Sequence, residues 1–171
     1  MLKKITSKNM LEKMRKALSG KKQTDWKAIV RKVQPEAKFY DPAADRQIEE
    51  AEKTLGCKLP SDLRSFLKTS NGLGFSESDA YPFVKTLDEI VEENQEYWND
   101  PFNRENYMPL DCLLFFGSPG VDGIQFAYPY SGKRPLNKGI FSWNPYDDGR
   151  TWMAPGLATF FEWWFTNKIH V

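Results

Sequence analysis

The chain has 171 residues, about the size of one ordinary domain, and its 40% hydrophobic and 27% charged residues exclude a disordered or a collagen-like chain. The net charge of +1 hides an asymmetry, because residues 1–38 carry twelve Lys and Arg against three Asp and Glu. That segment has a net charge of +9, whereas residues 39–171 have a net charge of −8. We therefore predict a basic helical N-terminal extension over residues 1–38 and an α+β domain over residues 39–171.

Two apolar stripes with helical spacing predict two short amphipathic helices in the basic extension. The first stripe lies within residues 10–18 and the second within residues 26–33, after which Pro35 stops the helix. Their members are Met10, Leu11, Met14 and Leu18, and then Trp26, Ile29, Val30 and Val33. We expect both helices to pack on the rest of the chain. Binding of single-stranded nucleic acid is disfavoured, because Trp26 is the one aromatic residue before Phe39 and a stacking platform is missing.

Two more helices are predicted between residues 45 and 72. Asp45 is expected to cap the first, and Gly56 to end it in the left-handed conformation. Ser61 is expected to cap the second, and Asn71-Gly72 stops it because both residues tolerate positive φ. This part of the chain is therefore predicted to be a helix pair with a short link.

The acidic centre of the chain lies between residues 88 and 105, where seven carboxylates stand against Arg104 alone. A short strand is predicted over residues 81–85, before a helix that runs through about Trp98. Thr86 and Glu89 have the spacing of a capping box, which opens this helix. Residues 99–108 are predicted to form a loop.

Strands dominate the last third of the sequence. The continuous apolar run at residues 112–116 predicts a buried strand, and residues 123–128, 140–143 and 151–153 predict three more. Residues 144–149 are typical of a hairpin turn, and Pro155 suits the first turn of a final helix with an apolar face. Helices followed by strands and a helix indicate an α+β fold, in which helices pack against a largely antiparallel sheet.

A series of motifs in the middle of the chain resembles the Smi-one/Knr-four, or SUKH, superfamily. The series consists of Ile48-Glu-Glu-Ala-Glu52, Leu55-Gly56, Leu59-Pro60, Leu63, Phe66-Leu67 and Asn71-Gly72. The later strand, hairpins and terminal Leu-x-x-Phe-Phe helix follow in the expected order, so the resemblance covers roughly residues 40–170. It implies a bent sheet flanked by helices. Bacterial members resemble immunity proteins that neutralise a toxin, often a nuclease, and fungal members act as hubs of cell-wall synthesis.

Two groups of residues are candidates for a partner-binding surface. The first is the acidic face of the helix over residues 86–98, and the second is the predicted hairpin tip. Their members are Asp88, Glu89, Glu92, Glu93 and Glu96, and then Tyr146, Asp147 and Asp148. An acidic surface suits the basic cleft of a nuclease, and Tyr is enriched in binding hot spots. Alternatives stay open: a solvated helix face, a docking site for the chain's own basic segment, and ordinary turn chemistry at Asp148-Gly149.

The sequence offers little for catalysis or metal binding. Cys57 and Cys112 lack a Cys-x-x-Cys partner, and the one histidine is His170, beside the C-terminus. We expect no cofactor, no metal and no enzymatic activity, and we expect a cytoplasmic location because neither a transmembrane run nor a signal peptide is present. The expected partner is a protein, specifically a toxin domain, with no membrane insertion and with nucleic acid disfavoured; binding of nucleic acid or anionic lipid by residues 1–38 stays open as a further alternative. A scaffold role in cell-wall synthesis is the alternative, and homo-oligomer formation stays open.

Overall fold

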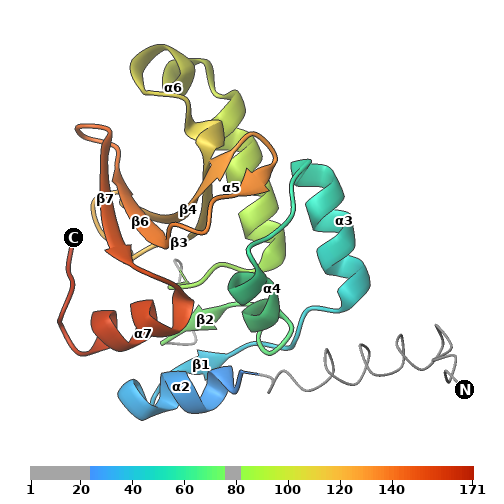
Figure 1. Ribbon diagram of the computed structural model, residues 1–171, viewed down its shortest axis with the longest axis vertical. Coiled ribbons are helices and arrows are strands. Elements are labelled where there is room, and N and C mark those ends of the chain that lie inside the picture. The colour runs from blue at the N-terminus through green and yellow to red at the C-terminus, as the bar shows by residue number, and fades with distance from the viewer. Residues whose placement is uncertain (1–23, 76–81) are drawn as a thin grey trace, which may run out of the picture.

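The computed structural model describes residues 24–75 and 82–171, which form an α+β fold (Figure 1). The first predicted stripe, within residues 10–18, lies outside the described residues. The described helices are α2 (Trp26–Val33), α3 (Asp45–Leu55), α4 (Ser61–Leu67), α5 (Leu87–Asn99), α6 (Pro101–Asn106), the 3₁₀ turn η1 (Leu110–Cys112) and α7 (Leu157–Phe165). The strands are β1 (Lys38–Phe39), β2 (Leu73–Gly74), β3 (Leu113–Gly117), β4 (Gln125–Ser131), β5 (Arg134–Pro135), β6 (Ile140–Asn144) and β7 (Gly149–Ala154).

All strand pairs are antiparallel, as predicted. The main sheet has the order β3-β4-β6-β7, with β5 paired to β4, and β1 pairs with β2 in a second, two-stranded sheet. Val84 bridges the two sheets, because it pairs with Leu73 on one side and Gly117 on the other. The register of β3 shifts between Phe115 and Gly117, and such bulges bend a strand. The predicted fold class, a bent and largely antiparallel sheet flanked by helices, is confirmed.

The main sheet buries apolar side chains on both faces, because successive residues of a strand point to opposite sides. Leu114 and Phe116 of β3 belong to the large core that α7 covers. Leu113 and Phe115 belong to a second cluster, which includes Trp143 and lies beneath α5 and α6 (Figure 1). The continuous apolar run of β3 therefore has a physical reason: the strand is covered on both faces.

Helix α2 packs against the C-terminal helix α7. The predicted stripe is confirmed, with Trp26 and Val30 buried. The Trp26 ring lies edge-on to Phe161 at 6.4 Å, and its Nε1 donates to the Ser65 hydroxyl at 2.9 Å. Of the predicted extension, the structure thus describes residues 24–38, and the division at residue 38 stays a prediction.

The motif series in residues 48–72 has structural roles. Glu52 is almost fully buried, and its carboxylate accepts hydrogen bonds from the Leu59 backbone N–H at 3.1 Å and from Lys58 Nζ at 2.6 Å. It therefore fixes the link between α3 and α4. Gly56 ends α3 with φ +69°, the left-handed conformation that the sequence predicts.

Three predicted helix starts are wrong by a residue or two. The N-cap of α3 is Ala44, whose N–H is satisfied by the Gln47 side chain, and the N-cap of α4 is Pro60. Asp45 instead pairs with Lys68 at 2.8 Å from the first turn of α3. Pro155 precedes α7, whose N-cap is Gly156. All three predicted helices are therefore present, but each begins one or two residues away from its predicted start.

Two segments between residues 81 and 108 differ from the prediction. The predicted strand over residues 81–85 is reduced to the single bridging residue Val84, and Tyr81 lies outside the described residues. The predicted loop over residues 99–108 contains α6, with Asp100 as N-cap and Pro101 at its first position. By contrast, the capping box of α5 is confirmed, since Glu89 N–H donates to the Thr86 hydroxyl and Thr86 N–H to Glu89.

The outer edge of β3 is closed by a side chain of α5. Asn94 is fully buried, its Nδ2 donates to the Phe115 carbonyl at 2.7 Å, and its Oδ1 accepts from the Phe115 N–H at 2.8 Å. The amide thereby takes the place of a neighbouring strand. No helix in the described ranges is long and apolar enough to cross a membrane.

Candidate protein-binding surface

The five acidic residues predicted on α5 do not act as one surface. Glu89 is used in the capping box, and Glu93 pairs with Lys85. Asp88 and Glu92 are exposed and line a groove between α3 and α5, whereas Glu96 is exposed outside that groove. Two of the five carboxylates therefore stabilise the fold, and three face solvent.

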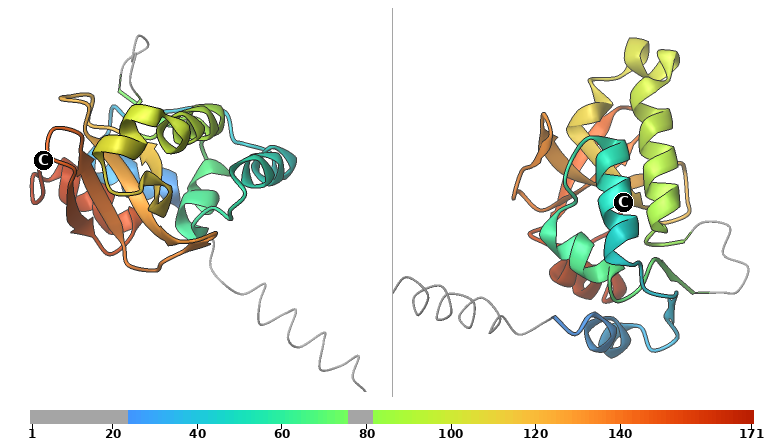
Figure 2. Two further views of the ribbon diagram at one scale, coloured as in Figure 1. Left: turned by 90° about the horizontal axis from the view of Figure 1, so that it is seen from above. Right: turned by 90° about the vertical axis from the view of Figure 1, so that its right-hand side faces the viewer.

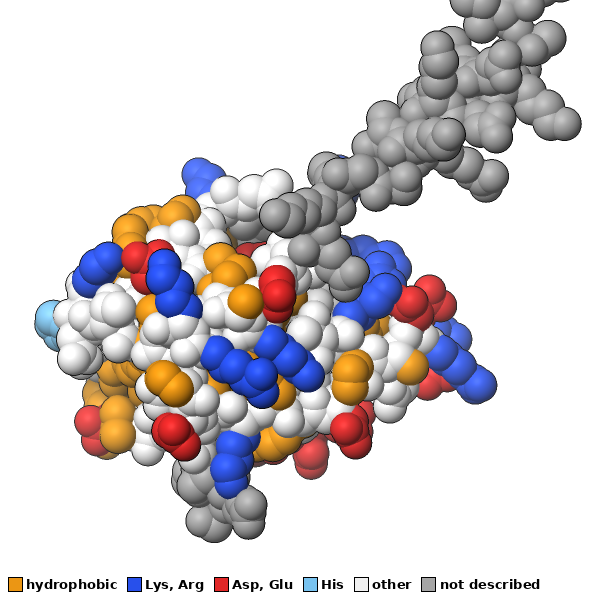
Figure 3. Space-filling view, turned by 90° about the horizontal axis from the view of Figure 1, so that it is seen from below, with side chains coloured by type: hydrophobic (Ala, Val, Ile, Leu, Met, Phe, Trp, Pro, Cys, Tyr) orange, Lys and Arg blue, Asp and Glu red, His pale blue; other side chains and the backbone are white. Residues whose placement is uncertain are grey.

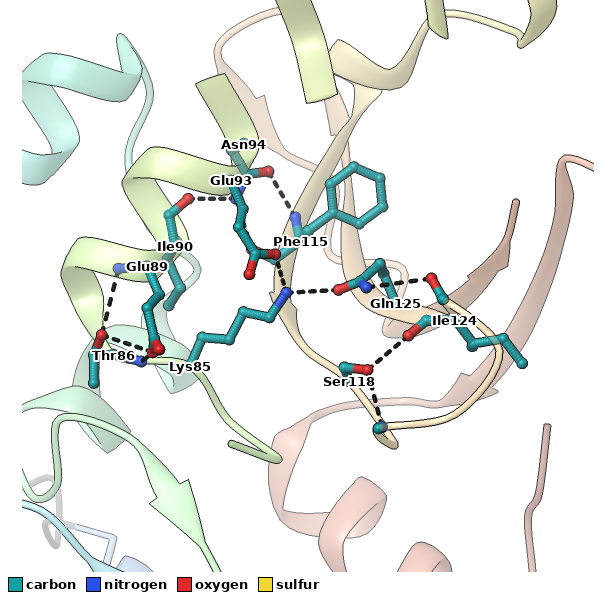
Figure 4. Close-up of polar contacts among 12 residues, drawn as sticks. Lys85, Thr86, Glu89, Ile90, Glu93, Asn94, Phe115, Ser118, Ile124 and Gln125 are labelled. Atoms are coloured by element: carbon teal, nitrogen blue, oxygen red, sulfur yellow. Dashed lines mark hydrogen bonds and ion pairs between the residues drawn. The ribbon is translucent and has the colours of Figure 1, made fainter. Parts of the chain in front are cut away.

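Lys85 is buried, with 3% of its surface exposed, and its side chain points towards Glu93 and Gln125 (Figure 4). Its ammonium pairs with Glu93 and donates to the Gln125 side-chain oxygen at 2.7 Å. Burial lowers the pKa of Lys85, and the ion pair with Glu93 acts in the opposite direction. This cluster joins α5 to β4, so its role is to hold the helix on the sheet.

The predicted hairpin tip is present, and its three residues have different environments. Tyr146 is 79% exposed, and Asp147 is exposed and accepts from the Gly149 N–H in the turn. Asp148 points inward, where its carboxylate accepts from Trp143 Nε1 at 2.7 Å and from the Met108 N–H at 2.8 Å. Arg150 also pairs with Asp148 at 3.1 Å and donates to the Met108 carbonyl at 2.8 Å. Asp148 is therefore a brace that fastens the hairpin to the segment after α6.

Three exposed apolar side chains lie on the two segments that this brace joins. Phe102, Met108 and Tyr146 are 62%, 57% and 79% exposed, the highest values among large hydrophobic residues in the described part of the chain. The Tyr107 ring lies 6.1 Å from the Phe102 ring, and its hydroxyl donates to the Pro145 carbonyl at 2.9 Å. We call Phe102, Met108 and Tyr146 the tip surface, and it lies where α6 and the β6–β7 turn approach each other (Figure 1).

The surroundings of the tip surface are acidic and hollowed. On the segments that carry it, exposed or half-exposed carboxylates at Asp100, Glu105, Asp111 and Asp147 outnumber Arg104 and Arg150. A pocket of about 190 Å³ lies between α5, α6 and η1, with Tyr107 in its wall. An aromatic and methionine surface with an acidic rim and an adjacent pocket can bind a basic protein surface.

Replacing Asp148 by Asn is expected to lower the free energy of unfolding by about 1–2 kcal/mol at pH 7, because hydrogen bonds to a charged group are weakened. Asn tolerates the left-handed backbone at this position, where φ is +54°. Burial raises the pKa of Asp148, but hydrogen bonds from Met108, Trp143 and Arg150 outweigh this and hold it below 3.8.

Because its pKa is lowered, the contribution of Asp148 to the free energy of unfolding depends on pH. The stabilisation is complete above the unfolded-state value near 3.8 and is lost as the pH falls through the folded-state value. Urea unfolding of both proteins should therefore show a difference that shrinks below pH 3.8. A constant difference from pH 7 to pH 3 would contradict the charged brace.

The comparisons with known proteins assign the fold to a family. Within the described ranges, no group of three His, Cys, Asp or Glu side chains is placed to hold a metal ion. No curated protein matches the chain. The model of the SMI1 / KNR4 family (SUKH-1) matches residues 42–163, which is more than half of the 171 residues. The chain therefore belongs to the SMI1 / KNR4 family (SUKH-1), as the motif series predicted.

Proposed function

We propose that the protein is a non-enzymatic binding protein of the immunity type, which neutralises a cognate toxin domain by covering it with the tip surface. The observation that carries the proposal is the exposure of Phe102, Met108 and Tyr146 on two segments that Asp148 and Arg150 join. Exposed aromatic and methionine side chains are enriched in the cores of interfaces. A platform that is already ordered loses little conformational entropy on binding.

The acidic rim of the tip surface supports a basic partner. A nuclease toxin must present a basic cleft to nucleic acid, and carboxylates around an apolar centre complement such a cleft. Complementary charge raises the association rate, and the buried apolar centre lowers the dissociation rate. The toxin domain is therefore expected to be positively charged at its active face.

A scaffold role in cell-wall synthesis is the second candidate, and one observation favours it. The face formed by α2 carries Lys and Arg side chains (Figure 3), and it lies at the end of the molecule opposite α6 and the β6–β7 turn (Figure 1). Lys27, Arg31 and Lys32 of α2 supply positive charge there. A protein with a basic end and an acidic end can hold two partners at once.

The immunity proposal is tested by calorimetric titration with the C-terminal domain of a secreted protein encoded beside this chain's gene. The intact protein is expected to bind one to one with nanomolar affinity, about −12 kcal/mol. Tyr146→Ala and Phe102→Ala are each expected to weaken binding roughly a hundredfold, as for hot-spot residues.

The matched control is Val121→Ala, which removes a side chain that is 52% exposed in another loop. This variant is expected to bind like the intact protein. Equal binding by all three variants would show that the toxin contacts another surface. Absence of binding by the intact protein would count against the immunity function itself.

A further inference from the structure

A second candidate surface lies on the side of the molecule away from the tip surface. Helices α3 and α5 run side by side there (Figure 2, right), and the groove between them has a volume of about 480 Å³. Its lining includes the apolar residues Ala51 and Val91, and Gln95 Nε2 reaches across to the Thr54 carbonyl at 3.5 Å. We call this feature the α3–α5 groove.

Carboxylates line both walls of the groove. Glu50 comes from α3 and is paired with Arg46 on the same helix at 2.9 Å. Asp88 and Glu92 come from α5, and within the described residues neither has an ion-pair partner. An apolar strip between acidic walls is complementary to an amphipathic segment with basic flanks.

The chain itself contains a segment of that chemistry. Residues 1–23 carry eight Lys and Arg against one Glu, and residues 10–18 contain the apolar stripe of Met10, Leu11, Met14 and Leu18. On a helix, Lys13 and Arg15 would flank this stripe, whereas Lys16 would lie on the opposite side. The sequence therefore provides both the apolar face and the positive charge that the groove lacks.

The described chain begins beside α4, the helix that follows α3. Thr24 lines a hollow with Ser61 and Ser65 of α4, at the end of α2 that is nearer to α3 (Figure 1). Five extended residues, 19–23, span up to about 17 Å. A nine-residue helix is about 13 Å long, which is close to the length of about 16 Å for α3. The basic face of α2 repels such a segment, and the acidic groove attracts it.

We propose that residues 10–18 bind in the α3–α5 groove of their own chain, with Met14 over Ala51 and Val91 and with Lys13 near Asp88 and Glu92. The bound segment then neutralises the charges of those carboxylates and blocks the access of other basic partners to them. This contact is independent of the tip surface, so either proposal can hold without the other.

The test is zero-length carbodiimide coupling of the full-length protein, followed by peptide mass spectrometry. This reagent joins Lys amines to carboxylates that are already in contact. Lys13 is expected to couple to Asp88 or Glu92 at least fivefold more than to the exposed Glu36 and Glu162. The coupling is expected to fall at least fivefold in 0.5 M salt and in Met14→Asp, because both charge attraction and apolar contact are required.

Lys16 provides the matched control, since it lies on the opposite side of the stripe. Coupling in a mixture of ¹⁴N- and ¹⁵N-labelled protein separates contacts within a chain from contacts between copies. Coupling of Lys13 and Lys16 to all exposed carboxylates at equal yield would overturn the proposal. Cross-links found mainly between differently labelled chains would also overturn it, because the occupant would then be a second copy.

Discussion

Replacing Glu93 by Ala is expected to lower the free energy of unfolding by about 3 kcal/mol. The Lys85 side chain is 4% exposed, and Glu93, which is 34% exposed, is its ion-pair partner. Removal of the carboxylate leaves a buried positive charge whose remaining hydrogen-bond partner in the described structure is the Gln125 amide oxygen, with the Glu89 carboxylate as a further favourable charge. Equilibrium urea unfolding at pH 7 measures the loss.

The double variant Lys85→Met/Glu93→Ala is the control, because it removes the buried charge together with its partner. It is expected to be more stable than Glu93→Ala alone, with a coupling energy of at least about 1 kcal/mol between the two positions. If the effects of the two single substitutions simply add, the pair does not stabilise α5 on the sheet.

Alkaline pH should partly rescue Glu93→Ala. Burial already lowers the pKa of Lys85 below 10.5, and loss of the opposing ion pair lowers it further. Between that lowered pKa and 10.5 the unfolded chain binds more protons than the folded chain, so stability rises with pH. The variant should therefore recover more stability than the intact protein when the pH is raised from 7 towards 10.

Replacing Glu52 by Ala is expected to lower the free energy of unfolding by about 3 kcal/mol. The carboxylate side chain is 2% exposed, and it accepts the Leu59 N–H in the link between α3 and α4. Its removal leaves this backbone N–H without its acceptor and ends the ion pair with Lys58. Thermal and urea unfolding should both report the change.

Glu50→Ala is the matched control on the same helix. Glu50 is exposed and pairs with Arg46 one turn away, so the expected change is below about 0.5 kcal/mol. Glu52→Gln keeps an acceptor for Leu59 and should lose less than Glu52→Ala. Equal losses for Glu50→Ala and Glu52→Ala would mean that the motif carboxylate has no special structural role.

The helices with strong local signals could be predicted from the sequence. The Thr86–Glu89 capping box, Gly56 and the stripe of α2 each act within one or two turns of chain, so neighbouring residues suffice to specify them. Caps were harder. The start of α3 is satisfied by Gln47, whose side chain replaces the usual Ser, Thr, Asp or Asn cap, and the apolar Ala44 gives no signal.

The short elements could not be predicted because their stability comes from distant partners. Helix α6 has six residues and buries none of them, so it has no apolar period, although Asp100-Pro101 is a recognisable helix start. Strands β1, β2 and β5 have two residues each and depend on pairing alone. Val84 similarly becomes a bridge only because β2 and β3 lie on either side of it.

The candidate surface was predicted in part. Tyr146 and Asp147 are exposed at the hairpin tip, as the turn pattern suggests, but Asp148 faces inward. Phe102 and Met108 were missed because single apolar residues in a polar segment have no periodic pattern. A large apolar residue inside a predicted loop was the available signal. The sequence could not show that these residues meet the hairpin, because 40 residues separate Met108 from Asp148.

The amide of Asn94 has a consequence for self-association. A strand edge with free N–H and C=O groups is a template for other chains and a starting point for aggregation. Because Asn94 occupies both backbone groups of Phe115, the β3 side of the main sheet offers no continuous ladder to an incoming strand. Within the described residues the opposite edge, β7, pairs with β6 alone. Growth of the sheet by strand addition is therefore directed to one side of the molecule.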